Sequence, residues 1–226
     1  MTTRERILQI SFKHFLLYGY DLANLNAIAD EVEIKKPSIY HHFSSKEEIL
    51  YACIQMIYHG TLDKIDEILS KTDSPKEQLT GLVGAIIDFH STVSYTIHET
   101  HLTPVSFVPI LSRSAQINSE LYELVSQYYD ALRQRVVAIL THGQNLSQVS
   151  PYLNKDLAAL EMIARIEGCL MMPTISKHFN QIELSRYLLD QLWGSVSVIE
   201  NDTQNKKDTK KRKPFDYKSI DLARKW

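Results

Sequence analysis

The chain has 226 residues, of which 44% are hydrophobic and 23% charged, a composition typical of a soluble globular protein with one large or two modest domains. No apolar run reaches the ~18 residues that a membrane helix needs, and the N-terminal sequence lacks the long apolar stretch of a secretory signal, so we expect a cytoplasmic protein. Cys53 and Cys169 have no metal-binding spacing and are expected to be reduced, buried thiols.

The formal net charge of −2 hides an uneven distribution. Residues 201–226 hold nine of the 25 Lys and Arg residues and four of the 27 acidic ones, which leaves an acidic body and a basic tail. The tail is too polar to bury a core and is predicted to be disordered. It is either simply solvated or makes sequence-independent contacts to phosphates.

Residues 3–18 repeat apolar side chains at helical spacing, and Gly19 is expected to end this first helix. Residues 25–46 then predict two short helices joined by a tight turn, with Pro37 in the first turn of the second. Four small or apolar residues share the inner face of the first short helix: Leu25, Ile28, Ala29 and Val32.

The second short helix has an apolar side and a polar side. Ile39 and Phe43 share a face, and Ile34 and Ile39 are apolar anchors that hold this helix across the first one, as in a helix-turn-helix unit. An exposed helix of this kind fits the major groove of DNA. The residues on or beside its outer side are Lys36, Ser38, Tyr40, His41 and His42.

Many positions of this stretch together resemble the DNA-binding domain of TetR-family transcription regulators. The resemblance covers residues 4–55 and rests on the run from Pro37 to Glu48, on Ile28-Ala29 and Ile34 before it, and on Gly19-Tyr20. It implies an all-α fold, with a helix-turn-helix, three-helix DNA-binding domain at residues 1–46 and a larger helical domain for ligand binding and dimerisation at residues 47–200.

The resemblance also implies which residues contact DNA. It places Asn24 and Asn26 near phosphate, and Lys36, Pro37, Tyr40 and His41 at the groove. The residues themselves add Ser38 on the reading helix and a local basic patch of Lys35, Lys36 and Lys46, because an acidic body supplies no general attraction for DNA. The alternative is that some of these side chains are merely exposed or structural.

Two positions depart from the family pattern. Glu33 stands where a turn glycine is usual, so either the turn differs or a non-glycine residue tolerates a positive φ there. Lys35 stands where a Ser or Thr cap is usual, so the reading helix is expected to lack a side-chain acceptor for its free N–H groups.

The remaining sequence predicts helices and no strand. Ser45 and Glu48 form a capping-box pattern that begins a long helix joining the two domains, and Ser74-Pro75 begins the next, which runs towards His101. Pro104 and Pro109 are expected to bracket a short helix. Three more helices are predicted: residues 117–142, ended by Gly143; residues 155–175; and residues 182–199.

The last two helices are apolar on more than one face, which favours a homodimer interface over a buried core in a monomer. The family resemblance likewise implies a homodimer built as a four-helix bundle. The residues expected at this interface are Leu160, Ala164, Gly168, Leu189, Trp193 and Val196.

The middle helices are rich in aromatic and apolar residues, and the family resemblance implies that they enclose a pocket for a small-molecule effector. The alternative is a tightly packed core and a regulator that responds to a protein or to nothing. The expected pocket residues are Phe89, Tyr95, Phe107, Tyr122, Tyr128 and Met162.

Catalytic and metal-binding patterns find little support. The densest histidine cluster, His98 and His101 with His90 before it, lacks the four-residue spacing of zinc proteases, so we predict neither a metal nor another cofactor. No phosphate loop or nucleophile elbow occurs, so we predict no enzyme. The sequence predicts a repressor that binds a palindromic DNA operator as a dimer and is released by a small apolar or amphipathic effector. The alternatives are control by a protein partner, activation, or DNA coating.

Overall fold

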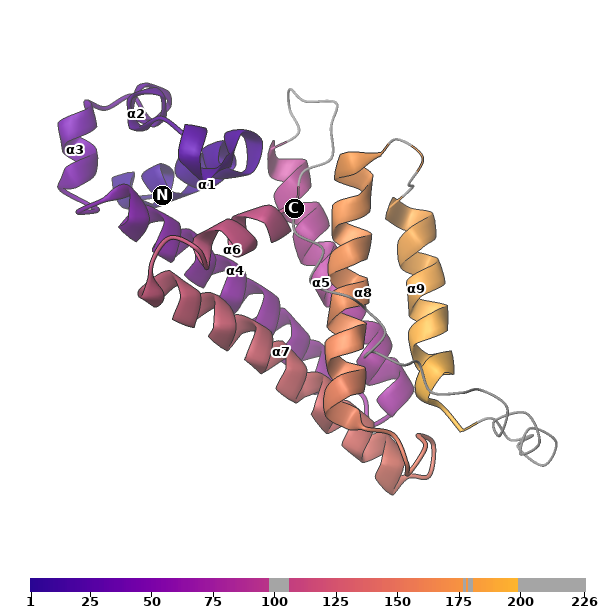
Figure 1. Ribbon diagram of the computed structural model, residues 1–226. Helices are drawn as coiled ribbons and strands as arrows, with labels where there is room; N and C mark the ends of the chain where they lie inside the picture. The colour runs from indigo at the N-terminus through magenta and orange to yellow at the C-terminus, as the bar shows by residue number, and fades with distance from the viewer. Residues whose placement is uncertain (98–105, 177, 179–180, 199–226) are drawn as a thin grey trace, which may run out of the picture.

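The computed structural model describes residues 1–97, 106–176, 178 and 181–198, and side chains are described except at residues 91–97, 181, 182 and 185. Within these ranges the structure is all-α (Figure 1). The helices are α1 (Thr3–Leu22), α2 (Leu25–Val32), α3 (Lys36–Tyr40), α4 (Lys46–Leu69), α5 (Pro75–Ile97), α6 (Val108–Ser114), α7 (Ser119–Asn145), α8 (Lys155–Ile175) and α9 (Gln181–Val196). The basic tail, His98, His101 and Pro104 lie outside the described residues, as does the side chain of Tyr95.

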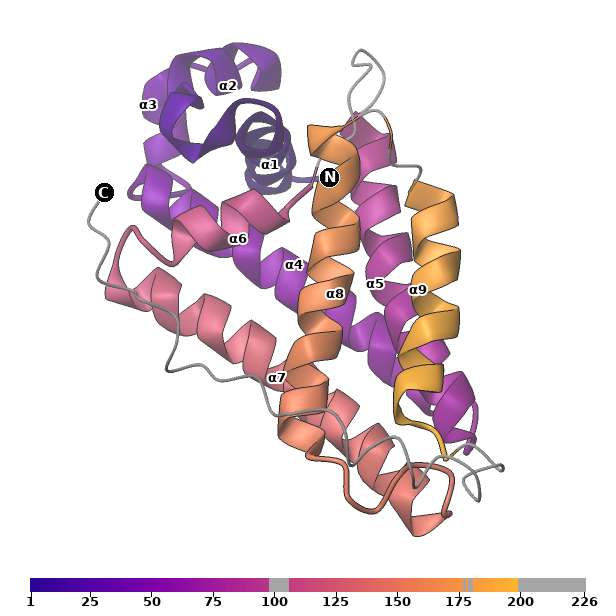
Figure 2. The ribbon, with the colours of Figure 1, turned by 45° about the vertical axis from the view of Figure 1, so that its right-hand side comes forward.

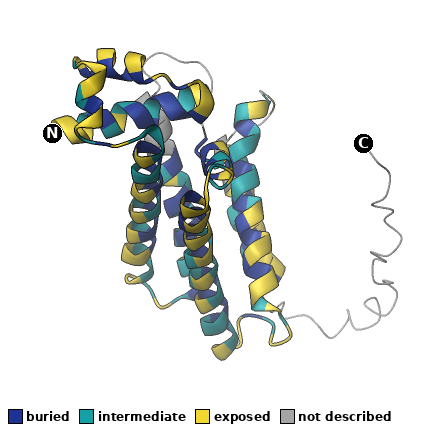
Figure 3. Ribbon diagram, turned by 60° about the vertical axis from the view of Figure 1, so that its left-hand side comes forward, coloured by how far each residue is buried: buried dark blue, intermediate teal, exposed yellow. Residues whose placement is uncertain are grey.

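The helices form two groups that share α4. Helices α1, α2 and α3 gather around the start of α4, and α5 and α7 pack along the rest of it (Figures 1 and 2). Helix α8 packs against α5 and α7, and α9 packs against α5 and α8. Figure 3 shows buried residues along the inner sides of both groups and exposed residues along their outer sides. The predicted boundary between residues 46 and 47 falls in the first turn of α4, and this helix runs unbroken from one group into the other.

Gly19 interrupts α1 but does not end it. Its φ of 76° lies in the region that favours glycine, and the chain then makes one further turn to Leu22, closed by a hydrogen bond from Ala23 N–H to Gly19 C=O. The first run of helical backbone therefore stops at Gly19, as predicted, and the further turn to Leu22 was not predicted.

The predicted roles of Gly143 and Pro109 as helix boundaries are also wrong. Helix α7 continues past Gly143 to Asn145. A Cβ at Gly143 would lie 2.5 Å from the Val149 side chain, so this glycine permits a close contact and does not mark the helix end. Helix α6 is not bracketed by Pro109 but contains it in its first turn, where a missing N–H costs no helical hydrogen bond.

The loop after α7 is tied to the end of α9. Val149 and Ser197 form an isolated antiparallel bridge, with Ser150 N–H donating to Val196 C=O and Val198 N–H donating to Gln148 C=O. In the described part of the chain this bridge is the sole β feature, so the expectation of a helical fold holds. None of the described helices combines the length and hydropathy needed to cross a bilayer.

Candidate functional site

The reading helix α3 is short and is held by apolar residues on its inner side. Ile39 and Phe43 are each 1% exposed, and Phe43 N–H donates to Ile39 C=O at 3.0 Å, which closes the turn that follows the helix. Lys36 and Tyr40 are exposed on the outer side, and His41 directly after the helix is exposed as well. Burial of the anchors thus leaves the basic and aromatic groups pointing outward.

The turn before α3 has the left-handed backbone conformation that suits the glycine usual at this position in the TetR-family pattern. Glu33 has φ 64° and ψ 41°, a left-handed conformation, so the chain tolerates a non-glycine residue there. Ile34 N–H donates to Ala29 C=O at 2.9 Å and fixes the turn. Lys35 is the N-cap of α3 and makes no side-chain capping bond, as predicted.

The residues predicted near phosphate lie at the start of α2. Asn24 is its N-cap, and the side-chain oxygen accepts a hydrogen bond from Asn26 N–H at 2.8 Å. Both residues are exposed. Asn24 therefore has a structural role in beginning α2, and its amide group remains at the surface.

Helix α2 is fixed to α1 through Glu31. Lys13 Nζ lies 2.7 Å from Glu31 Oε1, and His14 Nε2 lies 2.9 Å from Glu31 Oε2. Hydrogen bonding from Lys13, and then from His14, holds the pKa of the Glu31 carboxyl below its ordinary value. These contacts set the position of the helix-turn-helix unit on α1.

Lys46 is engaged within its own chain. Its Nζ lies 4.5 Å from the centre of the Tyr20 ring and 3.5 Å from the backbone oxygen of Asp21. Burial lowers the pKa of Lys46, and the charges of Asp21 and Glu47 oppose that effect. The Tyr20 hydroxyl donates to Glu47 Oε1 at 2.5 Å, so this group joins the end of α1 to the start of α4.

Two arginines beside the reading helix were missed by the sequence reasoning. Arg4 lies with its guanidinium carbon 4.6 Å from the centre of the Phe43 ring, and Arg6 Nη2 lies 4.0 Å from Glu33 Oε2. Both come from the first two turns of α1 and add positive charge near the turn and α3. Because α1 was expected to pack on the reading unit, basic residues at its start could have been predicted to lie near the reading helix.

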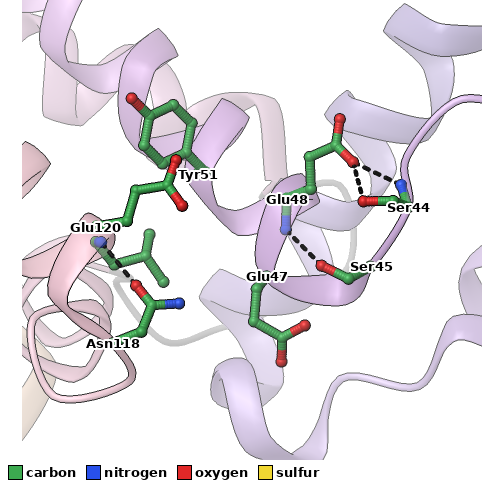
Figure 4. A pocket seen from close by; sticks show the side chains of 8 residues that line it. Ser44, Ser45, Glu47, Glu48, Tyr51, Asn118 and Glu120 are labelled. Atoms are coloured by element: carbon green, nitrogen blue, oxygen red, sulfur yellow. Dashed lines mark hydrogen bonds between the residues drawn. The ribbon is translucent and has the colours of Figure 1, made fainter.

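An acidic cleft lies at the start of α4, where α4 meets the start of α7 (Figure 4). It has a volume of about 360 Å³. The lining residues are Ser44, Ser45, Glu47, Glu48, Tyr51, Asn118, Glu120 and Leu121. Its carboxylates are unsuited to binding phosphate, whereas Arg4, Lys35 and Lys36 carry the positive charge that phosphate binding requires.

The predicted capping box at this cleft is only half formed. Ser45 Oγ accepts from Glu48 N–H at 3.1 Å, as predicted. The Glu48 carboxylate, however, accepts from the N–H and hydroxyl of Ser44, at 2.5 and 2.6 Å, instead of from Ser45 N–H (Figure 4). The extended conformation of Ser45 places Ser44 N–H within reach of that carboxylate.

The body between α4 and α8 contains most of the residues predicted for an effector pocket. Phe107, Tyr128 and Met162 are at most 2% exposed, and Phe89 is partly buried, with its ring centre 6.1 Å from that of Phe107. Tyr122 is 58% exposed on the outer side of α7, so we leave it out of the pocket proposed below.

The same region contains buried polar atoms that make no hydrogen bond. They are the Thr61 hydroxyl, both His90 ring nitrogens, the Tyr128 hydroxyl and Glu167 Oε2. Each costs about 1–3 kcal/mol when it is left unsatisfied in the interior. Burial raises the pKa of Glu167 to about 7 and lowers that of His90 to about 4. Sequence reasoning missed Thr61 and Glu167 because helical periodicity does not reveal which polar residues meet across the interior.

The α8 and α9 surface contains the residues predicted for a dimer interface. The two helices lie side by side (Figure 2), and Leu157 and Leu160 of α8 are 64% and 52% exposed. Ala164 is exposed, and Gly168, Leu189 and Trp193 are partly buried. Val196 is 4% exposed and packs within its own chain, so it does not belong to the interface proposed below.

The described residues hold no group of three His, Cys, Asp or Glu side chains that is placed to bind a metal ion. Burial raises the pKa of both cysteine thiols, and both are free and buried. The structure offers three features suited to binding: an exposed basic and aromatic helix, a polar cluster within the body and an apolar surface on α8 and α9.

Comparisons with known proteins agree with this arrangement. Residues 7–53 match the family model described as "Bacterial regulatory proteins, tetR family". The HTH-type transcriptional activator FasR of Mycolicibacterium smegmatis is 25% identical over 172 residues, which cover 73% of this chain and 78% of that protein. The HTH-type transcriptional repressor KstR2 of the same organism is 29% identical over 154 residues, 68% of this chain and 71% of that protein.

The solved structures extend the likeness to the whole fold. The ketosteroid transcriptional regulator KstR2 of Mycobacterium tuberculosis superposes with a TM-score of 0.67 at 20% sequence identity, over 88% of this chain and 96% of that chain. The superposition therefore extends well beyond residues 7–53, which the family model matches, to most of the chain.

Proposed function

Because the chain belongs to the tetR family of bacterial regulatory proteins and is a DNA-binding transcriptional regulator, we propose that it represses transcription by binding a palindromic operator as a homodimer and is released by a small apolar or amphipathic effector. The proposal that this chain binds an operator rests on the outward face of α3. Lys36 and Tyr40 are exposed while Ile39 fixes the helix from within. Lys36 supplies charge for phosphate, and Tyr40 and His41 supply polar groups for base edges.

The proposed dimer follows from the α8 and α9 surface. A single chain leaves Leu157 and Leu160 largely exposed on a helix that is buried on its other side. Burying these residues against a second copy removes apolar surface from water and pairs two reading helices, which gives a symmetric operator with two half-sites.

The proposed response to an effector uses the contact between α6 and the DNA-binding unit. Asp21, near the end of α1, forms an ion pair with Arg113 on α6, and α6 also contacts α7 and α8 of the body. An effector that binds one arrangement of the body better than another would shift α6 and, through this pair, the DNA-binding unit.

Activation is the second candidate. The relative FasR is named an activator and the relative KstR2 a repressor, and both match more than two thirds of this chain. A transcription assay on a promoter that carries the selected operator distinguishes the two functions, because a repressor lowers transcript yield and an activator raises it.

The experiment that tests the proposal is selection of bound DNA from a random pool, followed by affinity measurements at two salt concentrations. We expect a palindromic consensus, a loss of preference for it in Tyr40→Ala, and a shallower salt dependence in Lys36→Ala. Tyr152→Ala and Lys71→Ala, at exposed positions in the body, are the matched controls. Binding without a consensus, or many dimers coating each DNA, would overturn the proposal.

A further inference from the structure

Buried polar groups without hydrogen bonds are concentrated in one part of the molecule. Apart from the Ser11 hydroxyl, all such side-chain atoms among the described residues lie in the body. They belong to Thr61 on α4, His90 on α5, Tyr128 on α7 and Glu167 on α8. Folded proteins satisfy nearly all buried polar groups, so unsatisfied atoms contributed by four adjoining helices indicate groups that meet a partner on ligand binding.

Tyr128 connects three of the four helices. Its side chain is fully buried, and its hydroxyl lies near Thr61 of α4 without completing a hydrogen bond. Its ring centre lies 5.2 Å from that of Tyr129 and 6.0 Å from that of Tyr58. The Glu167 carboxylate of α8 is close enough to raise the pKa of both Tyr128 and Tyr129, with burial as the larger cause.

The negative charge in this cluster has no positive partner among the described residues. Glu167 forms no ion pair there, its Oε2 accepts no hydrogen bond, and the one group that lowers its pKa is the Tyr129 hydroxyl. His90 cannot supply the missing charge near neutral pH, because burial lowers its pKa to about 4. The cluster therefore combines an unpaired carboxylate with electron-rich tyrosine rings.

We propose that the effector carries an organic ammonium group, which binds Glu167 Oε2 and lies against the rings of Tyr128 and Tyr129. The inference rests on the proposed function, since it names the chemical class of the effector. A cation compensates the buried carboxylate and is attracted to the faces of aromatic rings. Above pH 7, where Glu167 is mostly ionised, a carboxylate effector would meet repulsion here, and an uncharged alcohol would leave the charge of Glu167 uncompensated.

The test is calorimetric titration of the full chain at pH 8, where Glu167 is mostly ionised, with three matched ligand series. Primary alkylammonium ions from ethyl to octyl, which can donate hydrogen bonds to Glu167 Oε2, are compared with the alkanols and the alkanoates of the same chain lengths. At the chain length that binds best, we expect the ammonium ion to bind at least tenfold more tightly than the alkanol, and the alkanoate to bind most weakly.

Two variants on α8 assign the effect to one carboxylate. Glu167→Gln keeps the side-chain shape but removes the charge, so it should weaken ammonium binding at least tenfold and leave alkanol binding unchanged. Glu161→Gln, at an exposed position paired with Arg165 on the same helix, is the matched control and should bind all three series as the parent does.

Several results would overturn the inference. They are preference of the parent chain for an alkanol or alkanoate, absence of ammonium binding at every chain length, and unchanged ammonium binding in a folded Glu167→Gln variant. The comparison among ligands needs no variant, so it decides the matter even if Glu167→Gln fails to fold. Release of the selected operator by an alkanol or alkanoate would overturn the ammonium inference while supporting the proposed function.

Discussion

The Arg113 guanidinium donates two hydrogen bonds to the Asp21 carboxylate, from Nε to Oδ2 at 2.8 Å and from Nη2 to Oδ1 at 2.9 Å. The pair joins α6 to the end of α1, and the hydrogen bond from Arg113 is the main cause that lowers the pKa of Asp21. Both side chains are more than 40% exposed, so solvent screens their attraction and limits what they add to stability. Their two-point geometry suits a role in fixing the position of one unit against the other.

Arg113→Gln should therefore change the response to an effector more than it changes folding. We expect a melting temperature close to that of the parent and a shift of at least threefold in the effector concentration that releases half of the operator. Fluorescence anisotropy of labelled operator measures this concentration. Lys71→Gln, which breaks the exposed pair with Glu67 on α4, is the control. An unchanged half-release concentration in Arg113→Gln would count against coupling through α6.

Glu33→Gly should stabilise the protein by about 0.5–1 kcal/mol, because glycine adopts the left-handed conformation of this turn without a Cβ penalty. The ion pair with Arg6 that this change removes is long and exposed, so its loss offsets little. Denaturant unfolding measures the difference. Asp30→Gly, three residues earlier on helix α2, should have the opposite sign and destabilise by a similar amount. If both substitutions change the free energy of unfolding in the same direction, this explanation of the turn is wrong.

Glu167→Gln should stabilise the ligand-free protein at pH 8 and leave its stability unchanged at pH 4. The pKa of Glu167 is about 7 in the folded chain against an ordinary value of 4.5, so folding favours the protonated form. Stability of the parent chain therefore falls as pH rises from about 4.5, and the full cost of the buried charge is present above about 7. Tyr128 and Tyr129, which face the carboxylate, stay neutral over this range because burial raises their pKa further.

The difference between Glu167→Gln and the parent should reach about 1–3 kcal/mol at pH 8. Urea unfolding at both pH values measures it, and Glu161→Gln provides the exposed control on the same helix. A gain that is equal at pH 4 and pH 8 would mean that packing rather than charge explains the effect.

Leu160→Glu should convert the proposed dimer into a monomer without unfolding the chain. Leu160 is 52% exposed in a single chain, so a carboxylate there is solvated in the monomer but would be buried at the interface. Sedimentation velocity measures the mass, and operator affinity should fall because only one half-site is bound at a time. Leu146→Glu, at a 49% exposed position after α7, is the control. A dimer that persists in Leu160→Glu would place the interface elsewhere.

The sequence predicted the local features of the structure well. The helix over 155–175 has the predicted limits, since Asn154 caps it through Leu157 N–H and the apolar periodicity continues to its end. The exposed face of the reading helix followed from the spacing of Ile39 and Phe43. Capping residues and periodicity act within a few positions along the chain, so one sequence reveals them.

Contacts between distant segments were not predictable in the same way. Lys46 belonged to the predicted phosphate-binding patch, but its position on the Tyr20 ring depends on how α1 meets α4. Asp21 and Arg113 are 92 positions apart, and no spacing rule links them. Thr61 and Glu167 likewise lie near Tyr128 through the packing of three helices, which periodicity alone does not determine.

The unbroken course of α4 limits how this protein can be divided or recombined. Ile49, Leu50 and Cys53 lie beyond residue 46 yet are fully buried, and Cys53 Sγ lies 4.0 Å from the backbone oxygen of Leu8 on α1. A fragment cut after residue 46 would lose the side chains that close its core. A chimera that transfers the DNA specificity of this chain to another regulator must therefore carry α4 at least through Cys53 and make its junction inside a helix, with the helical phase of the recipient preserved.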